Sequence, residues 1–261
     1  MTGDGNMETI QSCSEIVAKA KNIVVLTGAG ISTESGIRDF RSRTGIYNHA
    51  PEYILSMDYF HEHPMAFYEF AFSNLYHPKA MPNKGHRILA KWEQEGRIDC
   101  IITQNIDGLH QKAGSKNVIE FHGTMKTATC QNCGQKYSAD DLLIRKQTDE
   151  KFFVCRECEA DRDLFHLIKP DVVLFGDAGE WFTPEGFEKI LNRIAEADCL
   201  LILGTSLRVT PFSAFPQYKN KNIPMIIINK GDTPYDYDND TYVIQHSIGR
   251  CLSEIDDYLK N

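Results

Sequence analysis

The stretch NIVVLTGAGIS, at residues 22–32, joins an apolar run rich in β-branched residues to a glycine turn. This pattern predicts a buried strand that enters a helix through a loop able to hold a phosphate. Gly28 and Gly30 match the first two glycines of a dinucleotide-binding loop, whereas Thr33 stands where the third is expected. An incomplete glycine pattern is a weak signal alone, so the fold prediction depends on the rest of the chain.

Four further runs have the apolar composition of buried parallel strands. They are IDCIIT at 98–103, VVLFGD at 172–177, DCLLILGTS at 198–206 and PMIIIN at 224–229. Two stretches, at 83–96 and 184–197, carry apolar residues at helical spacing. Alternating strands and helices predict an α/β fold built on a doubly wound, Rossmann-like parallel sheet.

The segment TQNIDGLHQKAG, at residues 103–114, places four hydrogen-bonding side chains where a buried strand ends. They are Gln104, Asn105, Asp107 and His110. Such side chains are costly to bury unless they pair with one another or bind a ligand. Because ligands of doubly wound sheets bind beyond the carboxyl ends of the strands, we expect a crevice there. The expected crevice comprises residues 28–32, 104–107 and 204–206 together with Asn229.

Two segments interrupt the alternation of strands and helices. Residues 44–80 are rich in aromatic side chains and are predicted to form a small helical insertion, whereas residues 126–168 carry the paired cysteines. The remaining residues, 1–43, 81–125 and 169–261, are predicted to form one discontinuous Rossmann-like domain.

Four of the eight cysteines form two C-x-x-C pairs, Cys130 with Cys133 and Cys155 with Cys158. The 21 residues 134–154 between the pairs slightly exceed the usual zinc-ribbon spacing, and a hairpin loop closes such a gap. Four thiolates fit a tetrahedral zinc ion, and a site without an open ligand position is structural. A redox C-x-x-C motif and two disulfides are alternative interpretations, which we rank below zinc because no secretion signal is found.

The composition of the 261 residues limits the partners. With 42% apolar and 25% charged residues the chain has the composition of a globular protein, and no run is long enough to span a bilayer. A formal net charge of −8 argues against direct binding of nucleic acid and favours basic partners such as lysine-bearing peptides. No membrane partner is expected, and we expect a cytoplasmic protein.

Several short motifs together point to one family. They are GAGISTESGIRDFR at 28–41, TQNIDGLHQKAG at 103–114, HG at 122–123, the four cysteines, KPDVVLFGD at 169–177, GTSLRVTP at 204–211 and INK at 228–230. Their combination and order resemble the sirtuin family of NAD-dependent protein lysine deacylases, and most closely its bacterial deacetylases. The resemblance extends from about residue 16 to residue 250.

The resemblance implies NAD as co-substrate and a structural zinc ion. The NAD contacts that it implies are Gly28, Ala29, Gly30, Thr33, Phe40, Arg41, Gln104, Ile106, Asp107, Gly204, Thr205, Ser206 and Asn229. It also implies that His122 is the general base for a ribose hydroxyl and that Asn105 orients the ribose hydroxyls or a water molecule. An unperturbed histidine titrates near pH ~6.5, which suits a base at neutral pH. The products implied are nicotinamide, free lysine and O-acyl-ADP-ribose.

The acyl-lysine peptide is implied to add as a strand between the segments VVLFGD and SLRVTP. Val173, Phe175 and Gly176 would form one wall of that channel. Family members that prefer acidic acyl groups share a Tyr-x-x-Arg pair, with which Tyr68-Glu69-Phe70-Ala71 aligns here. Tyr68 is therefore a candidate contact of the acyl chain, and the missing arginine predicts neutral acyl groups, with acetyl preferred.

Three other functions use parts of the same pattern. A mono-ADP-ribosyltransferase would share the NAD pocket, and a noncatalytic NAD-sensing adaptor would share the pocket and the zinc module. Neither needs the whole set of Asn105, Asp107 and His122. A dehydrogenase is disfavoured because no acidic residue closes a second strand about 20 residues after the glycines. Of the remaining polar residues, His110 is expected to make a structural hydrogen bond.

Overall fold

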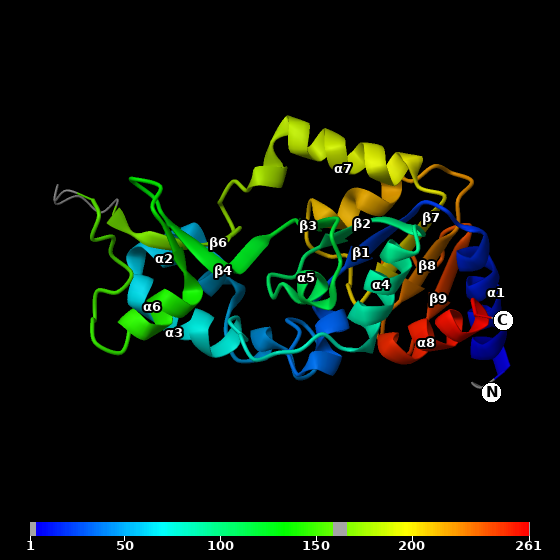
Figure 1. Ribbon diagram of the computed structural model, residues 1–261, viewed down its shortest axis with the longest axis horizontal. Helices are drawn as coiled ribbons and strands as arrows, with labels where there is room; N and C mark the ends of the chain where they lie inside the picture. The colour runs from blue at the N-terminus through cyan, green and yellow to red at the C-terminus, as the bar shows by residue number, and fades with distance from the viewer. Residues whose placement is uncertain (1–3, 159–165, 261) are drawn as a thin grey trace.

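The computed structural model describes residues 4–158 and 166–260. Within these residues, a six-stranded sheet has the strand order β3-β2-β1-β7-β8-β9, and every neighbouring pair is parallel (Figure 1). The strands are β1 (Ile23–Thr27), β2 (Ile98–Thr103), β3 (Val118–Glu120), β7 (Cys199–Leu203), β8 (Met225–Ile228) and β9 (Thr241–Ile244). The strand order reverses between β1 and β7, so the predicted doubly wound sheet is confirmed, with its switch point beside the glycine loop.

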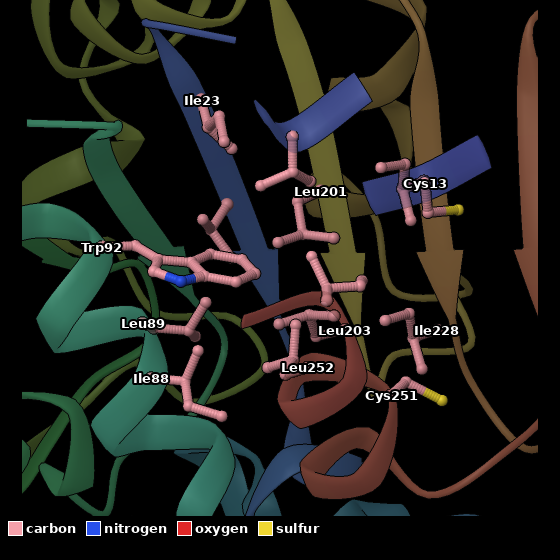
Figure 2. Packing of buried hydrophobic residues seen from close by; sticks show 14 of the residues in the cluster. Cys13, Ile23, Ile88, Leu89, Trp92, Leu201, Leu203, Ile228, Cys251 and Leu252 are labelled. Atoms are coloured by element: carbon pink, nitrogen blue, oxygen red, sulfur yellow. The ribbon is translucent and has the colours of Figure 1, made fainter. Parts of the chain in front are cut away.

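Helices cover both faces of this sheet. The helices are α1 (Asp4–Lys19), α4 (Lys84–Gln94), α5 (Leu109–Ala113), α7 (Pro184–Glu196) and α8 (Ile248–Tyr258). Figure 2 shows Trp92 and Leu89 of α4 and Leu252 of α8 directed at Leu201 and Leu203 of β7. Alternate residues of the same strands pack on the opposite face against α7 and the 3₁₀ helix η6 (Phe212–Tyr218). Both faces are apolar because parallel sheets are buried on both sides.

The two helices predicted from apolar periodicity are confirmed, and their ends follow local chemistry. Helix α4 starts after Asn83, whose side chain accepts hydrogen bonds from the backbone N–H groups of Gly85 and His86. Helix α7 starts after Thr183, which caps Gly186 N–H, with Pro184 at the first helical position. None of the helices in the described residues is long and apolar enough to cross a membrane.

One predicted strand is wrong. The segment 172–177 does not join the parallel sheet; residues Ile168–Val172 form β6, which pairs antiparallel with β4 (Gly123–Cys130) in a separate sheet that includes β5 (Lys136–Ser138). The apolar run of 172–175 concealed the alternation that precedes it, in which Lys169 and Asp171 are half-exposed between buried neighbours. That alternation is typical of an antiparallel strand with one face exposed to solvent.

The aromatic insertion and the cysteine module share one core. The insertion folds into η2 (Ile46–Asn48), η3 (Glu52–Leu55), α2 (Met57–Glu62) and α3 (Pro64–Asn74), and the module adds α6 (Ala139–Arg145). Buried rings of both segments, including Phe60, Phe67 and Phe152, form a single cluster with residues of the small sheet. The predicted domain boundary at residue 126 falls inside β4, and residues 159–165 of the predicted zinc module lie outside the described residues. The domain division remains a prediction.

Candidate functional site

The glycine loop after β1 packs backbone against backbone on the end of β7. Gly28 N–H donates to Leu203 O at 3.0 Å, and Gly30 N–H donates to Gly204 O at 2.8 Å. A Cβ at Gly30 would lie 2.6 Å from Gly204 Cα, so no side chain fits there. The loop continues as the 3₁₀ helix η1 (Ala29–Ser35) instead of a regular helix, and Thr33 Oγ1 donates to Gly30 O within it. This use of Thr33 differs from the close-packing role of a third glycine.

The polar side chains after β2 form hydrogen bonds with the glycine loop. Asn105 Nδ2 donates to Ser32 Oγ at 3.2 Å, and Ser32 Oγ donates to Asp107 Oδ2 at 2.6 Å. The other carboxylate oxygen of Asp107 accepts from Leu109 N–H at 2.9 Å. No specific role for Ser32 could be predicted from the sequence, because a serine at a helix start has the pattern of an ordinary cap. Side chains that follow two different strands therefore form one polar network where the crevice is expected.

Gln104 links the ends of three central strands. Its side-chain Oε1 accepts from Thr205 Oγ1 at 2.8 Å, and its backbone N–H donates to Thr27 O at 2.9 Å. The predicted contacts Thr205 and Gln104 thus lie together. Asn229 follows β8, where its Nδ2 donates to Gly231 O at 2.7 Å.

His122 lies between β3 and β4 with one ring nitrogen engaged. Its Nδ1 is 3.2 Å from Gln104 O, and since a carbonyl only accepts, Nδ1 carries the proton and Nε2 carries the lone pair. Burial lowers the pKa of His122 to about 4, against the opposing effect of the Gln104 carbonyl. The imidazole is therefore neutral at neutral pH, but the expectation of an unperturbed pKa is wrong because the ring is buried. Through Gln104, His122 is linked to the segment that also carries Asn105.

Arg41 and Phe40 lie together at the far end of the glycine loop. Arg41 Nη2 is 2.7 Å from Glu52 Oε1, and its guanidinium lies 5.1 Å from the centre of the Tyr47 ring. The Phe40 ring contacts the same tyrosine, with ring centres 5.2 Å apart. Arg41 thus has a carboxylate partner, and any phosphate contact would compete with that ion pair.

Phe175 and Val173 lie on an extended segment beside His122. Val173 N–H donates to His122 O at 2.9 Å, and Phe175 is held by Leu55 O and Met57 N–H at 2.8 and 3.0 Å. The Phe175 side chain is 46% exposed, so one apolar ring stands free at the surface. Gly176, at φ +85°, follows it.

Tyr68 is buried in the aromatic core of the small module. Its side chain is 1% exposed, and its hydroxyl donates to Ile168 O at 2.7 Å inside the aromatic core. Ala71, at the position of the missing arginine, is 0% exposed. Tyr68 therefore packs in the core of the small module, and its contact with an acyl chain stays a prediction.

A model of the Sir2 family matches residues 28–211, which include the glycine loop, the polar segment and the four cysteines. The chain belongs to the Sir2 family. Curated relatives named NAD-dependent protein deacetylase include one from Bacillus anthracis, 40% identical over 253 residues, covering 94% of this chain and 97% of the relative. A second, from Listeria innocua, is 39% identical over 250 residues, covering 94% of this chain and 100% of the relative.

Solved Sir2 structures share the fold over nearly the whole chain. A Sir2 variant with a deacetylated p53 peptide and 3′-O-acetyl ADP ribose has a TM-score of 0.85 at 32% identity and covers 95% of this chain and 97% of its own. A Sir2 complex with a p53 peptide and NAD+ has a TM-score of 0.81 at 32% identity, with the same coverage of both chains. The resemblance found in the motifs is thereby confirmed.

The four paired cysteines of this Sir2 chain form one cluster. Their Sγ atoms all lie within 4.8 Å of one another, and two of the separations, Cys130 to Cys158 and Cys133 to Cys155, are 3.6 and 3.7 Å. Four sulfurs at ~2.3 Å from a tetrahedral zinc ion stand roughly 3.8 Å apart, whereas a disulfide needs about 2.05 Å. The four sulfurs fit a structural zinc ion, and their separations are too long for the two-disulfide alternative.

Local hydrogen bonds favour the thiolate form of Cys155, whereas burial raises the pKa of Cys130 and of Cys158. Burial opposes ionisation of Cys155, but the Tyr137 hydroxyl and the backbone N–H groups of Glu157 and Cys158 outweigh it and lower the pKa of Cys155 to about 6. The Tyr137 oxygen lies 3.0 Å from Cys155 Sγ. Tyr137 thus stabilises the thiolate of Cys155 without itself being a metal ligand.

Proposed function

We propose that this protein is an NAD-dependent protein lysine deacetylase that releases nicotinamide, free lysine and O-acetyl-ADP-ribose. The observation that carries the proposal is the neutral His122, whose Nδ1 donates to Gln104 O beside the Asn105, Ser32 and Asp107 network. Within the described part of the chain, Nε2 of His122 has no hydrogen-bond partner, which leaves it open to a substrate hydroxyl. A base needs that combination of fixed orientation and free lone pair.

The residues of the crevice have separable roles in this proposal. NAD, when bound, supplies the ribose that accepts the acyl group as nicotinamide leaves. The glycine loop and the 204–206 turn approach closely enough to hold the dinucleotide, with Ala29, Thr33, Ser206 and Asn229 around it. Asp107 and Ile106 face the nicotinamide end, and Asn105 orients the ribose hydroxyls. His122 removes the hydroxyl proton at Nε2, and Phe40 excludes water.

The acyl-lysine peptide is proposed to bind as an extended strand between residues 173–176 and 204–211. The exposed ring of Phe175 supports this position because an apolar lysine stem needs such a surface. Backbone pairing of this kind tolerates varied sequences. Gly176, without a side chain, leaves room for a partner strand.

We propose that neutral acyl groups are preferred and that acetyl is the principal one. Tyr68 and Ala71 are both buried, so this part of α3 offers no basic side chain to an acidic acyl group. A carboxylate transferred from water without a partner is strongly disfavoured.

We also propose that the enzyme acts in the cytoplasm. The zinc site needs four reduced thiolates, and cytosolic conditions keep thiols reduced. Separating cytosolic, membrane and exported fractions of cells that carry the gene, followed by immunodetection, tests this location. Recovery in an exported fraction would contradict it.

The deciding experiment follows peptide mass and nicotinamide release together. Purified protein is incubated with an acetyl-lysine peptide, with and without NAD, beside a His122→Ala variant. We expect deacetylation only with NAD, one nicotinamide per lysine freed, and little turnover by the variant. Gain of ADP-ribose mass on a protein while the acetyl group stays would favour a transferase. NAD binding without turnover would favour a sensor.

A further inference from the structure

Two buried histidines lie next to the threonine pair that holds the Asn105 backbone. His86 on α4 is 0% exposed and His110 on α5 is 1% exposed, and their ring centres are 4.9 Å apart. Each ring has one nitrogen, Nε2 of His86 and Nδ1 of His110, without a hydrogen-bond partner among residues 4–158 and 166–260. Buried polar atoms are normally paired, so two unpaired nitrogens on adjacent rings need an explanation.

The proton of His86 is placed by its other nitrogen. Asn83 N–H donates to His86 Nδ1 at 3.4 Å as part of the helix cap. Nδ1 is therefore the acceptor, and a neutral ring carries its proton on Nε2. The unpaired atom of His86 is a buried donor.

The proton of His110 is constrained by a threonine pair. His110 Nε2 lies 3.0 Å from Thr27 Oγ1, which donates to Thr103 Oγ1 at 2.8 Å. With the Thr27 proton used in this way, His110 donates from Nε2 and leaves Nδ1 as an acceptor. The opposite tautomer would set two buried N–H groups against each other, and neither would be satisfied.

We propose that His86 and His110 are positioning residues that share one hydrogen bond, from His86 Nε2–H to His110 Nδ1, made after a small ring rotation or through one buried water. Ring centres 4.9 Å apart are close enough for a nitrogen of one ring to reach hydrogen-bond distance from a nitrogen of the other. The bond pairs the unpaired donor with the unpaired acceptor. It therefore gives each of the two buried nitrogens a hydrogen-bond partner.

This bond would complete a closed ring of contacts around the site. On one side Asn83 Nδ2 donates to Ile31 O at 2.7 Å, inside the glycine loop. On the other side Thr103 Oγ1 accepts from Asn105 N–H at 3.0 Å, and Asn105 returns to the loop through Ser32. The histidine pair would thus fix the loop that approaches NAD relative to the side chain that orients the ribose.

The electrostatic setting is consistent with two neutral rings. Burial lowers the pKa of His86 to about 4, with Arg87 adding to the effect and Asp107 and Glu34 opposing it. Burial and the neighbouring His86 lower the pKa of His110 well below its ordinary value. A charged His86 would place a second N–H against Asn83 N–H, which the cap does not accommodate.

The first test assigns the tautomers in the intact, ¹⁵N-labelled chain by long-range ¹H–¹⁵N correlation at neutral pH. We expect both rings to be neutral with the proton on Nε2, and we expect the His86 Nε2–H resonance to move in a His110→Phe variant. A proton on Nδ1 of His110 would overturn the proposal. This measurement needs neither NAD nor turnover.

The second test is a double-mutant cycle with His86→Phe, His110→Phe and the double variant. Each single change leaves one buried nitrogen unpaired, whereas the double change removes both, so we expect the two losses in Tm to be clearly non-additive. Additive losses would contradict a shared hydrogen bond. His61→Phe, on the surface of α2, is the matched control.

The third test measures the kinetics of deacetylation and therefore rests on the proposed function. We expect each single variant to lower kcat/KM for NAD by about 10- to 100-fold while KM for the peptide stays near that of the parent. An equal effect on both substrates would indicate general loss of structure instead of positioning. If the parent enzyme shows no deacetylation, the proposed function fails, but the tautomer assignment and the cycle still decide this inference.

Discussion

Ser32 Oγ donates a hydrogen bond to Asp107 Oδ2 over 2.6 Å and joins the loop after β1 to the segment after β2. The same oxygen accepts from Asn105 Nδ2 at 3.2 Å, so one hydroxyl positions both a carboxylate and an amide. A short bond to a carboxylate is charge-assisted and stronger than a neutral one. The two side chains reach the crevice pre-oriented, before any ligand binds.

Replacing Ser32 by alanine should weaken NAD binding. A hydrogen bond to a charged group contributes about 1.5–3 kcal/mol, so Kd for NAD should rise by about 10- to 100-fold. Calorimetric titration of NAD checks the value, and Ser42→Ala, an exposed serine, is the control. An unchanged Kd in the Ser32 variant would show that Asp107 holds its orientation without the hydroxyl.

Replacing Gly30 by alanine should disrupt the junction of β1 and β7. The added Cβ would lie 2.6 Å from Gly204 Cα, which is backbone and cannot swing away. We expect a loss of at least about 2 kcal/mol in the free energy of unfolding, together with loss of NAD binding. Gly231→Ala, where a Cβ meets nothing within 4 Å, should change the unfolding midpoint very little. Equal effects of the two substitutions would contradict the packing argument.

Stability should fall as the pH drops from 6.5 towards 4. The pKa values of His86 and His122 are about 4 in the folded chain against 6.5 for an exposed histidine, so in this window the unfolded chain binds more protons. Each group lowers the free energy of unfolding by up to about 3 kcal/mol across the window. Urea unfolding at several pH values measures the slope, which should be smaller in a His86→Phe variant. A slope that His86→Phe leaves unchanged would show that His86 titrates normally.

Removing zinc should disorganise the small module and abolish activity. The cluster of four sulfurs lies in the core that also packs α2 and α3, so loss of the metal should loosen both. Metal analysis should find one zinc per chain, lost in Cys155→Ser and retained in Cys251→Ala, which is far from the cluster. Full activity of metal-free protein would rule out the scaffold role.

Acetyl-lysine peptides should be turned over much faster than succinyl-lysine peptides of the same sequence. The basis is the buried pair Tyr68 and Ala71, which leaves an acyl carboxylate unpaired. Comparing kcat/KM for the two peptides checks the preference. Comparable values would mean that a basic group from another element reaches the acyl chain.

Much of the fold could be predicted because its signals are local. The apolar runs that become β1, β2, β7 and β8 are buried on both faces, and periodicity places α4 and α7 within one or two residues. The segment 172–177 was misassigned because an apolar run does not specify which sheet a strand joins. The burial of Tyr68 could not be foreseen either, because it depends on how α3 packs against β6.

The sequence by itself determined the chemistry available to this protein: a glycine loop, a polar segment after a strand, one histidine before a glycine and four paired cysteines. Residue type and short spacing carry that information, since each motif acts within a few residues. Only the tertiary structure decided which groups meet. Ser32 reaches Asp107 and Thr205 reaches Gln104 because a parallel sheet brings the ends of distant strands to one edge. His86 meets His110 because α4 packs against α5.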